Sequence, residues 1–280
     1  MLPDADGSRA GAVVALKPVA RAKSRLGGLP DPLRRRLAWT MAVDTLTALA
    51  GGGADLVVVS DQPALASRLA RAGVRARVVG ESGAVGMNGA LTRGAQLLAA
   101  AGCSTVLACV GDLPALRPAS VQAVLRAAPE SGRAFLADAS GTGTTMLLAR
   151  RTELDPRFQG PSAAAHAASG ATPLTDDQLG TAVPDARSDV DTEDDLGAAV
   201  ELGLGAATAR LVDSRGQLGR YAVITTTGHT DDQDHPLAVT SAGYRVRLPP
   251  DALADGLRTL RPGQRLHSVL SDDVVLSAWL

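Results

Sequence analysis

The chain has 280 residues, of which 45% are hydrophobic, and its 28 lysines and arginines nearly balance its 29 aspartates and glutamates, leaving a formal net charge of −1. This length allows one large domain, or a medium domain with a small one. The near-neutral charge and the aromatic content of only 2% argue against DNA or RNA binding, which depends on phosphate neutralisation and base stacking. A small-molecule ligand is therefore expected.

The ends of the chain and its cysteines predict a cytoplasmic protein. The first ten residues, MLPDADGSRA, lack the basic start and apolar run of a secretory signal, and no run is long enough to cross a membrane. Cys103 and Cys109 fall in or beside one apolar strand, where we expect them on the same side but too far apart to form a disulfide. Two buried thiols fit a reducing compartment.

Short apolar runs alternate with helical patterns from residue 11 to about residue 212, after a flexible N-terminus at 1–10. Strands are predicted at 11–17, 54–60, 74–79, 104–110, 134–138 and 144–150, and helices at about 30–53, 62–73, 91–101 and 117–130. Continuous Val, Leu and Ala strands between amphipathic helices indicate a mostly parallel sheet that is covered on both faces. The predicted fold is therefore a doubly wound α/β domain.

The pattern changes after a predicted linker at 213–218. Residues 219–280 contain short β runs and polar turns, enough for a small five-stranded barrel, and YRVRLPPDAL with LRPGQRL weakly resembles cold-shock-like OB domains. Such domains bind single strands through aromatic side chains, which are scarce here (Tyr221, Tyr244 and Trp279). We favour a structural or oligomerising appendage, whose removal after about Gln217 is expected to leave catalysis largely intact.

The first strand leads into LKPVARAKSRLGG, which contains four cations and a hydroxyl (Lys17, Arg21, Lys23, Arg25 and Ser24). Ligands of doubly wound folds bind at the carboxyl ends of the strands, where this loop begins. Backbone N–H groups in a turn, together with lysine and arginine, suit a phosphate. A solvated basic loop is an equally plausible alternative, since the Walker and Rossmann glycine patterns are absent.

Acidic side chains gather in two distant stretches. Asp112 in GDLPAL follows a buried strand, where a carboxylate suits Mg²⁺, although a helix cap or turn aspartate is the alternative. In RSDVDTEDDL, Thr192 is expected to cap a helix with Asp195 at the capping-box position, which leaves Asp189 and Asp191 without such a role. These two alternate in an extended segment and so point the same way. We therefore predict that they meet Asp112 around one or two Mg²⁺ ions.

Uncharged polar groups lie in two further stretches. Asn88, expected in a glycine-rich loop, suits a purine edge or a ribose, although a plain turn asparagine is nearly as plausible. The threonines of DASGTGTTML offer hydroxyls and N–H groups to an anion (Thr142, Thr144 and Thr145). Ser162 opens a short helix whose N-terminus favours a carboxylate or phosphate. His166, one turn later, is more typical of a satisfied structural histidine.

The chain lacks a nucleophile elbow, an H-E-x-x-H pattern, a Cys/His metal cluster and a clear catalytic triad. A reaction whose nucleophile arrives already ionised, such as a phosphate group, needs none of these. In that reaction, cations and positioning do nearly all the work.

As a set, these stretches resemble the nucleotidyltransferases of coenzyme F(420) biosynthesis, the 2-phospho-L-lactate or phosphoenolpyruvate guanylyltransferases. The matching stretches cover about residues 11–212 in the expected order (LKPVARAKSRL, MAVDTLTAL, VVVSDQ, GDLPAL, GTGTTML, PRFQGPSAAAHAASGA, SDVDTEDDL and LGLGAATARLV). The resemblance implies a three-layer, glycosyltransferase-A-like fold. It also implies a reaction of GTP with a small phosphorylated three-carbon acid to give a guanylylated diphosphate and pyrophosphate.

The resemblance implies roles for single residues as well. Mg²⁺ would bind between Asp112 and the Asp189/Asp191 pair, and the nucleotide would contact the first loop, Asn88 and Asp112, with Asp112 and Lys23 as catalytic residues. The residues of that loop at the nucleotide would be Lys17, Lys23, Ser24 and Arg25. The acid would rest against Thr144, Gln159, Gly160 and Ser162.

One loop departs from the family pattern. The family usually has Arg-Phe-Gly where this chain reads Arg157-Phe158-Gln159-Gly160, which leaves open whether Gln159 or Gly160 takes the role of the glycine. The sequence also does not choose between phosphoenolpyruvate, 2-phospholactate and phosphoglycerate.

Two other function classes remain as alternatives: a sugar-phosphate or molybdopterin nucleotidyltransferase, and a nucleic-acid-associated regulator that acts through the C-terminal domain. Among protein partners, the resemblance suggests a downstream transferase of the deazaflavin pathway. A homodimer is the default oligomer.

Overall fold

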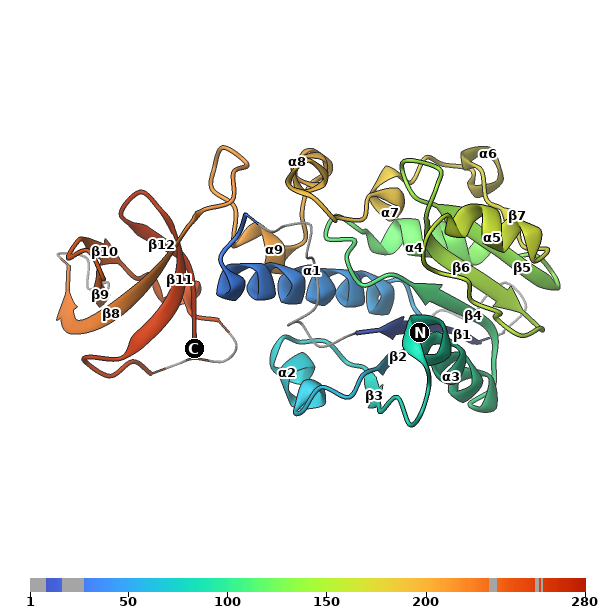
Figure 1. Ribbon diagram of the computed structural model, residues 1–280, viewed down its shortest axis with the longest axis horizontal. Helices are drawn as coiled ribbons and strands as arrows, with labels where there is room; N and C mark the ends of the chain where they lie inside the picture. The colour runs from blue at the N-terminus through green and yellow to red at the C-terminus, as the bar shows by residue number, and fades with distance from the viewer. Residues whose placement is uncertain (1–8, 17–27, 232–235, 255–256, 258) are drawn as a thin grey trace.

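The computed structural model describes residues 9–16, 28–231, 236–254, 257 and 259–280. It contains a seven-stranded sheet with its helices and a closed five-stranded barrel, with the long helix α1 (Asp31–Gly51) reaching from one toward the other (Figure 1). Among these residues, we find no helix with both the length and the apolarity to cross a membrane.

The sheet is mixed, with the strand order β3-β2-β1-β4-β6-β5-β7. Its strands are β1 (Arg9–Ala15), β2 (Asp55–Val59), β3 (Arg77–Val79), β4 (Cys103–Cys109), β5 (Gly132–Ala137), β6 (Thr144–Arg150) and β7 (Thr172–Pro173). Only β6 runs antiparallel to its neighbours, because six residues join it to β5 and a parallel return would need a crossover of a dozen or more. The predicted α/β architecture with a mostly parallel sheet is confirmed.

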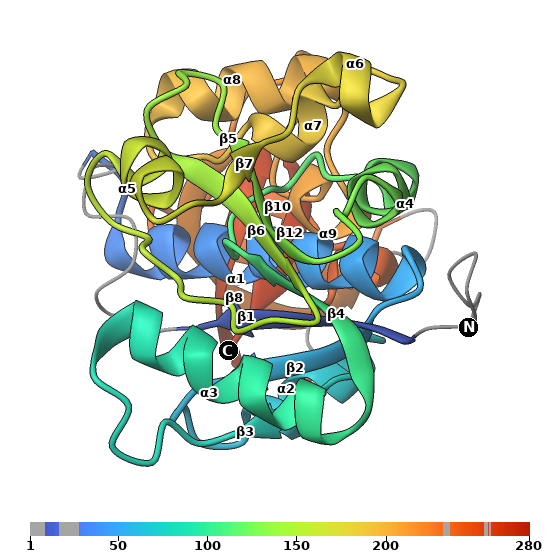
Figure 2. The same ribbon diagram turned by 90° about the vertical axis from the view of Figure 1, so that its right-hand side faces the viewer.

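Helices cover both faces of the sheet (Figure 2). Buried residues of α1, α2 (Leu65–Arg71) and α4 (Pro118–Arg126) share one apolar cluster with the strands, whereas α3 (Gly86–Ala100) and α5 (Ser162–Ala168) share another. Four short helices follow: α6 (Asp176–Leu179), α7 (Pro184–Arg187), α8 (Glu193–Leu202) and α9 (Ala206–Ala209). The two clusters make this part of the chain a layered fold around a central sheet.

Two local predictions are wrong. Helix α3 begins at Gly86, five residues before the predicted start, so Asn88 lies in its first turn and not in a loop. The glycines of this stretch weaken the helical pattern, but burial of Leu91 overrides that cost. Cys103 and Cys109 lie in different apolar clusters, not on one side, because the pairing of β4 with β1 shifts register between Arg9 and Ala10. Both thiols are buried and free.

The predicted small C-terminal barrel is present. Its strands are β8 (Arg220–Thr230), β9 (Pro236–Thr240), β10 (Arg245–Arg247), β11 (Arg265–Ser271) and β12 (Val274–Trp279), with a 3-10 helix, η2 (Pro250–Ala252), between β10 and β11. The strands close in the order β10-β12-β11-β8-β9, and β10 pairs with β12 in parallel. Closure leaves no long unpaired edge.

The barrel shares an apolar core with the α/β part. Leu33, Leu37 and Met41 of α1 belong to one buried cluster with Val269 and Trp279 of the barrel. The same cluster includes residues of α8 (Leu196 and Ala199). One part of helix α1 therefore packs against the sheet and its helices, and another part packs against the barrel. Removal of the residues after Gln217 would expose this part of α1, and the expectation that catalysis survives their removal stays a prediction.

Candidate functional site

A cavity of about 750 Å³ opens at the carboxyl ends of β1 and β4. Its lining includes Leu16 after β1, Gly111 and Asp112 after β4, and residues from later loops and from α1. Doubly wound sheets bind ligands at this edge, because several loops converge there. The cavity is therefore the candidate active site.

Asp112 begins a turn whose next two residues are both hydrogen-bonded to other segments. The N–H of Leu113 donates to Thr45 Oγ1 at 3.0 Å, and the carbonyl of Pro114 accepts from the N–H of Gly205 at 2.7 Å. The next helix, α4, has Arg117 as its N-cap, so Asp112 does not cap a helix. The alternative of a helix-cap aspartate is therefore wrong.

Gly111 explains how the carboxylate comes so close to the sheet. A Cβ atom at this position would lie 2.9 Å from Leu16 Cδ2 and 3.4 Å from Val14 Cγ1, which is too close to Leu16 for a side chain without movement. A glycine before Asp112 lets the chain turn against the end of β1.

The second acidic stretch lies directly beside the first. The N–H of Val190 donates to the carbonyl of Asp112 at 3.1 Å, and Asp189 and Asp191, on either side of Val190, line the same cavity. The structure thus brings Asp112 together with two carboxylates that lie 77 and 79 positions later in the sequence. We call Asp112, Asp189 and Asp191 the acidic wall.

The acidic wall is electrostatically crowded. The pKa of Asp189 is raised to about 7, first by burial and then by the negative charges of Asp112 and Asp191. A buried carboxylate beside two others resists ionisation unless a cation balances the charge.

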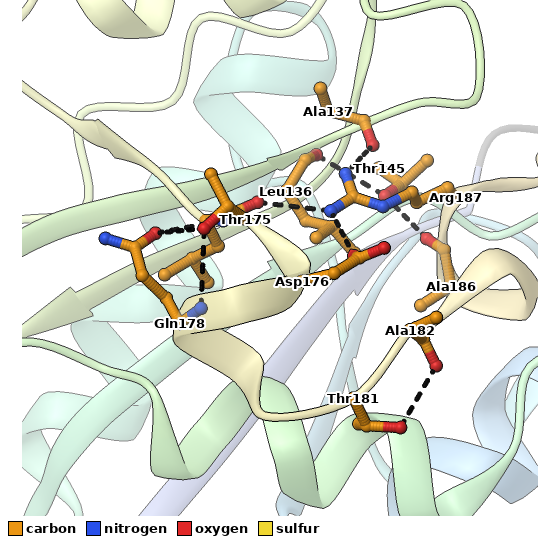
Figure 3. Close-up of polar contacts among 11 residues, drawn as sticks. Leu136, Ala137, Thr145, Thr175, Asp176, Gln178, Thr181, Ala182, Ala186 and Arg187 are labelled. Carbon is orange, nitrogen blue, oxygen red and sulfur yellow. Dashed lines mark hydrogen bonds and ion pairs between the residues drawn. The ribbon is translucent and has the colours of Figure 1, made fainter.

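The segment before the acidic pair is anchored to the sheet (Figure 3). The Arg187 guanidinium donates to the carbonyls of Ala137 at 3.0 Å and Leu174 at 3.1 Å, and it forms an ion pair with Asp176 at 3.0 Å. Next to it, Thr145 Oγ1 donates to the carbonyl of Ala186 at 2.7 Å. These bonds fix α7, and with it the start of the segment that carries Asp189.

The predicted cap of the following helix is present. Thr192 is the N-cap of α8 and forms a capping box with Asp195, whose carboxylate also accepts from the N–H of Asp191 at 3.0 Å. Capping therefore uses Asp195 and leaves the carboxylates of the acidic wall in the cavity lining.

The acidic wall fits a hard divalent cation by its chemistry. Among the described residues, no three side chains of His, Cys, Asp or Glu already converge as a finished metal site. The carboxylate oxygens of the wall are nevertheless the ligands that Mg²⁺ prefers, and Mg²⁺ commonly takes only one or two carboxylates and completes its shell with water and phosphate oxygens. The donor set therefore suits a cation that arrives with a polyphosphate.

A second part of the lining is uncharged. Thr144, Gln159, Gly160 and Ser162 line the cavity, and we call them the donor wall. Thr145, expected to offer its hydroxyl to an anion, is instead fully buried and bonds Ala186.

The N–H groups near the donor wall are largely used within the protein. The N–H of Ser162 donates to the carbonyl of Gly160 at 2.8 Å and that of Ala163 to the carbonyl of Thr142 at 3.1 Å. The N–H of Thr142 donates to Asp138 Oδ1 at 3.0 Å. The side-chain hydroxyls of Thr144 and Ser162 are therefore better placed as donors than the first N–H groups of α5.

The loop with the departure from the family pattern has an unusual backbone. Gln159 has φ +106° and Gly160 has φ +58°, so both occupy a region that favours glycine. The backbone conformation of Gln159 is therefore one that a glycine adopts without strain. The loop is held by Asn88, whose Nδ2 donates to the carbonyl of Phe158 at 3.0 Å while its Oδ1 accepts the N–H of Phe158 at 2.9 Å. Asn88 thus supports the loop from α3 with both ends of its amide.

His166 of α5 lies behind the donor wall and is fully buried. Its Nδ1 is 2.9 Å from Thr144 Oγ1, and its Nε2 accepts from the N–H of Arg157 at 2.9 Å. Burial is the main cause that lowers its pKa to about 4. The prediction of a satisfied structural histidine agrees with these bonds, but its link to Thr144 was missed.

Sequence reasoning assigned no role to two other lining residues. Trp39 of α1 lines the cavity, with the Arg68 guanidinium 4.1 Å from its ring centroid. Asp138, also in the lining, accepts from Ser140 Oγ at 2.9 Å. A tryptophan in a helix pattern is typical of the core, to which the buried Trp39 does belong, so only the fold shows that it also borders the cavity. Lys17, Arg21, Lys23, Ser24 and Arg25 lie outside the described residues.

Comparisons with known proteins agree on one family. The family model described as guanylyl transferase, CofC like, matches residues 10–212. The phosphoenolpyruvate guanylyltransferase of Salinispora arenicola is 47% identical over 205 residues, which are 71% of this chain and 91% of that protein. Proteins of the same name from Streptomyces coelicolor and Geodermatophilus obscurus are 46% and 42% identical, and the matches cover 70% and 71% of this chain and 92% of each relative.

Proposed function

The chain belongs to the CofC-like guanylyl transferase family, and from this premise we propose that it joins GTP to phosphoenolpyruvate, releasing pyrophosphate, as a step of coenzyme F(420) biosynthesis. The observation that carries the proposal is the cavity whose lining combines the acidic wall with the donor wall. A triphosphate held through a cation suits the first, and a small anion suits the second.

The reaction needs positioning more than proton transfer. A phosphate oxygen of the acid attacks the α-phosphorus of GTP, a new P–O bond forms, and the bond from the α-phosphorus to the β-phosphate bridging oxygen breaks. Pyrophosphate takes the bonding electrons as it leaves. No step requires an amino-acid base, because the nucleophile is already an anion, and holding two anions in line is the main task of the site.

In our proposal, Asp112, Asp189 and Asp191 hold Mg²⁺. When bound, such a cation neutralises phosphate charge and so favours the pentavalent transition state. The three carboxylates are the appropriate oxygen donors, and they are kept in place by the Val190–Asp112 backbone bond and by the anchored segment before Asp189. Lys17, Lys23 and Arg25 of the first loop, with Ser24, are proposed to contact the triphosphate.

The acid is proposed to rest on the donor wall. Thr144 and Ser162 supply hydroxyl donors from buried positions, and the Gln159–Gly160 backbone curves around the same cavity. Hydrogen bonds from neutral donors to a charged oxygen are stronger than those between neutral groups. Asn88 was expected at the nucleotide, but both ends of its amide are bonded to Phe158, so we propose that it acts through the loop beside the acid.

The test is a pyrophosphate-release assay with GTP, Mg²⁺ and one acid at a time. We expect release with phosphoenolpyruvate, and comparison with 2-phospho-L-lactate and phosphoglycerate gives the acid preference. ATP in place of GTP should give little or none. Release only with a sugar phosphate or a molybdopterin would overturn the proposed substrate, and no release with any acceptor would overturn the proposed reaction.

We further propose that the two parts of the chain, 11–212 and 219–280, are a glycosyltransferase-A-like domain and an OB-like barrel. Support for the barrel comes from its pairing: the first strand, β8, pairs with the second and fourth, and the third pairs with the fifth in parallel. Its shared core with α1 favours a structural role over strand binding.

A further inference from the structure

The bonds of His166 determine which way its ring is protonated. An amide N–H can only donate, so the N–H of Arg157 requires a lone pair on Nε2 of the ring, 2.9 Å away. In a neutral imidazole the other nitrogen then carries the proton. Nδ1–H therefore faces Thr144 Oγ1 as a donor at 2.9 Å, and the backbone of Ser162 is a further hydrogen-bond partner of the ring.

The surroundings keep this ring neutral. Phe135 and Phe158 flank it, with ring centroids 5.9 and 5.1 Å away. The charged groups that face it are Asp155, Arg157 and Arg133, and the Asp155 carboxylate is already paired with both arginines, at 2.6 Å to Arg133 and 3.2 Å to Arg157. Burial lowers the pKa of the ring to about 4, so the neutral form holds through the physiological range.

The proton of the Thr144 hydroxyl then points away from the ring. It accepts from His166, and within the described part of the chain no other hydrogen bond of Oγ1 is found, while the residue lines the cavity. A hydroxyl that accepts on one side is free to donate on the other.

We propose that His166 is a positioning residue that frees the proton of the Thr144 hydroxyl to donate to an oxygen of the phosphorylated acid. The same ring holds the N–H of Arg157 and so fixes the start of the loop that carries Gln159 and Gly160. His166 thereby determines both the direction of the hydrogen bond to Thr144 and the position of the adjoining loop. This inference rests on the proposed function for the identity of the acid.

The consequence is selectivity for an acceptor atom. A hydroxyl carries one O–H and two lone pairs, and because His166 donates to one lone pair of Thr144, the O–H cannot bond the ring and is available to a ligand. A three-carbon acid whose phosphate or carboxylate oxygen meets Thr144 is favoured over an analogue with a neutral donor group at that point, because a charged acceptor makes the stronger hydrogen bond.

Two variants separate the two bonds of the ring. His166→Asn can retain a donor near the position of Nδ1, and His166→Gln can retain an acceptor near the position of Nε2. Thr144→Val removes the hydroxyl at nearly equal volume, and Thr144→Ser retains it. His229→Gln, an exposed histidine of the barrel, is the control.

The readout is the KM for the acid at saturating GTP, set against the KM for GTP. We expect Thr144→Val to raise the acid KM roughly tenfold or more and Thr144→Ser to recover most of that loss. His166→Gln should raise the acid KM several-fold more than His166→Asn, with the GTP KM little changed. The double variant His166→Gln/Thr144→Val should be no worse than Thr144→Val alone, since His166 acts through the hydroxyl.

Equal acid KM values for the Asn and Gln variants, or fully additive losses in the double variant, would overturn the proposal. A second measurement does not depend on turnover or on the folding of variants: ¹⁵N NMR of the histidine rings in the full-length protein. We expect His166 to carry its proton on Nδ1 at pH 7, and a proton on Nε2 would overturn the proposal. If His166 of the wild-type chain carries its proton on Nδ1 but the chain shows no guanylyl transfer, the proposed function is wrong while the assigned direction of the His166–Thr144 hydrogen bond remains.

Discussion

The acidic wall and the donor wall face one cavity but differ in how complete they are. In the donor wall, Thr144 is already oriented by a neutral histidine, and the loop beside it is bonded by His166 and Asn88. In the acidic wall, the backbone is equally well held, yet Asp189 is pushed toward protonation by its neighbours. The donor wall is held by hydrogen bonds within the protein, whereas the carboxylates of the acidic wall repel one another.

This difference shows two ways to prepare a site. Orienting dipoles in advance costs little when the orienting groups are themselves hydrogen-bonded, as His166 and Asn88 are. Gathering carboxylates costs free energy until a cation joins them, which ties the folded site to metal binding.

The largest effect is expected from Asp112→Asn. The variant keeps the size of the side chain but removes a charge from the proposed cation site, so turnover should fall roughly a hundredfold or more. Thermal unfolding should change little, because the turn around Asp112 is held by backbone bonds. Asp213→Asn, at a separate turn, is the matched control. Near-normal pyrophosphate release by Asp112→Asn would contradict the metal assignment.

The acidic wall should make the metal-free protein less stable as the pH rises. The folded pKa of Asp189 is about 7, above its ordinary value of 3.8, so its contribution is fully present below about pH 4 and is lost as the pH rises through 7. The loss at pH 8 amounts to at most a few kcal/mol. Denaturant unfolding with and without Mg²⁺ measures it, and added Mg²⁺ should restore stability.

Asp189→Asn serves as the control for this effect. The variant lacks the titrating group, so its stability should depend less on pH between 4 and 8 than that of the wild type. If the free energy of unfolding depends on pH in the same way for both proteins, the pKa of Asp189 is not raised in the folded state.

The donor wall should respond to pH in the opposite direction. His166 has a folded pKa of about 4, below the ordinary 6.5, so its contribution is fully present above pH 6.5 and is lost as the pH falls toward 4. The loss reaches up to about 3 kcal/mol. Denaturant unfolding of the wild type and of His166→Gln between pH 7 and 4.5 should give curves that approach each other in acid, and parallel curves would be the contrary result.

The smallest effect concerns the backbone of the donor wall. Gln159 adopts φ +106°, so Gln159→Gly should relieve strain of about 1 kcal/mol and raise the melting temperature by roughly 2–4 °C. Gln159→Ala keeps a Cβ and should not. If both variants instead weaken binding of the acid equally, the Gln159 side chain contacts the substrate and its strained backbone has a functional reason.

The sequence predicted much of the fold because periodic apolar patterns dominate it. The strand positions, the covered sheet, the barrel and the Thr192–Asp195 cap follow from patterns within ten or twenty residues. The antiparallel β6 and the early start of α3 did not, since one depends on a short connection and the other on burial of a glycine-rich turn.

The sequence predicted the charged residues of the site, but not the residues that act through hydrogen bonds to other segments. Asp112, Asp189 and Asp191 stand out as carboxylates after strands, and the structure brings them together. The buried position of Thr145 and the amide bonds of Asn88 with Phe158 depend on the facing segment, which no local pattern identifies. His166 is ordinary in sequence, and only its two partners show what it does.

The matched family region ends at residue 212, but the apolar cluster around Leu37 does not end there. Val269 and Trp279 complete that cluster from the far end of the chain, and Arg36 places its guanidinium 5.5 Å from the Trp279 ring centroid. Helix α1 also carries Trp39, in the lining of the cavity. The matched region therefore ends before the apolar core of α1 is complete. Deleting the barrel to obtain a shorter enzyme would expose apolar side chains of α1, the helix that also borders the cavity.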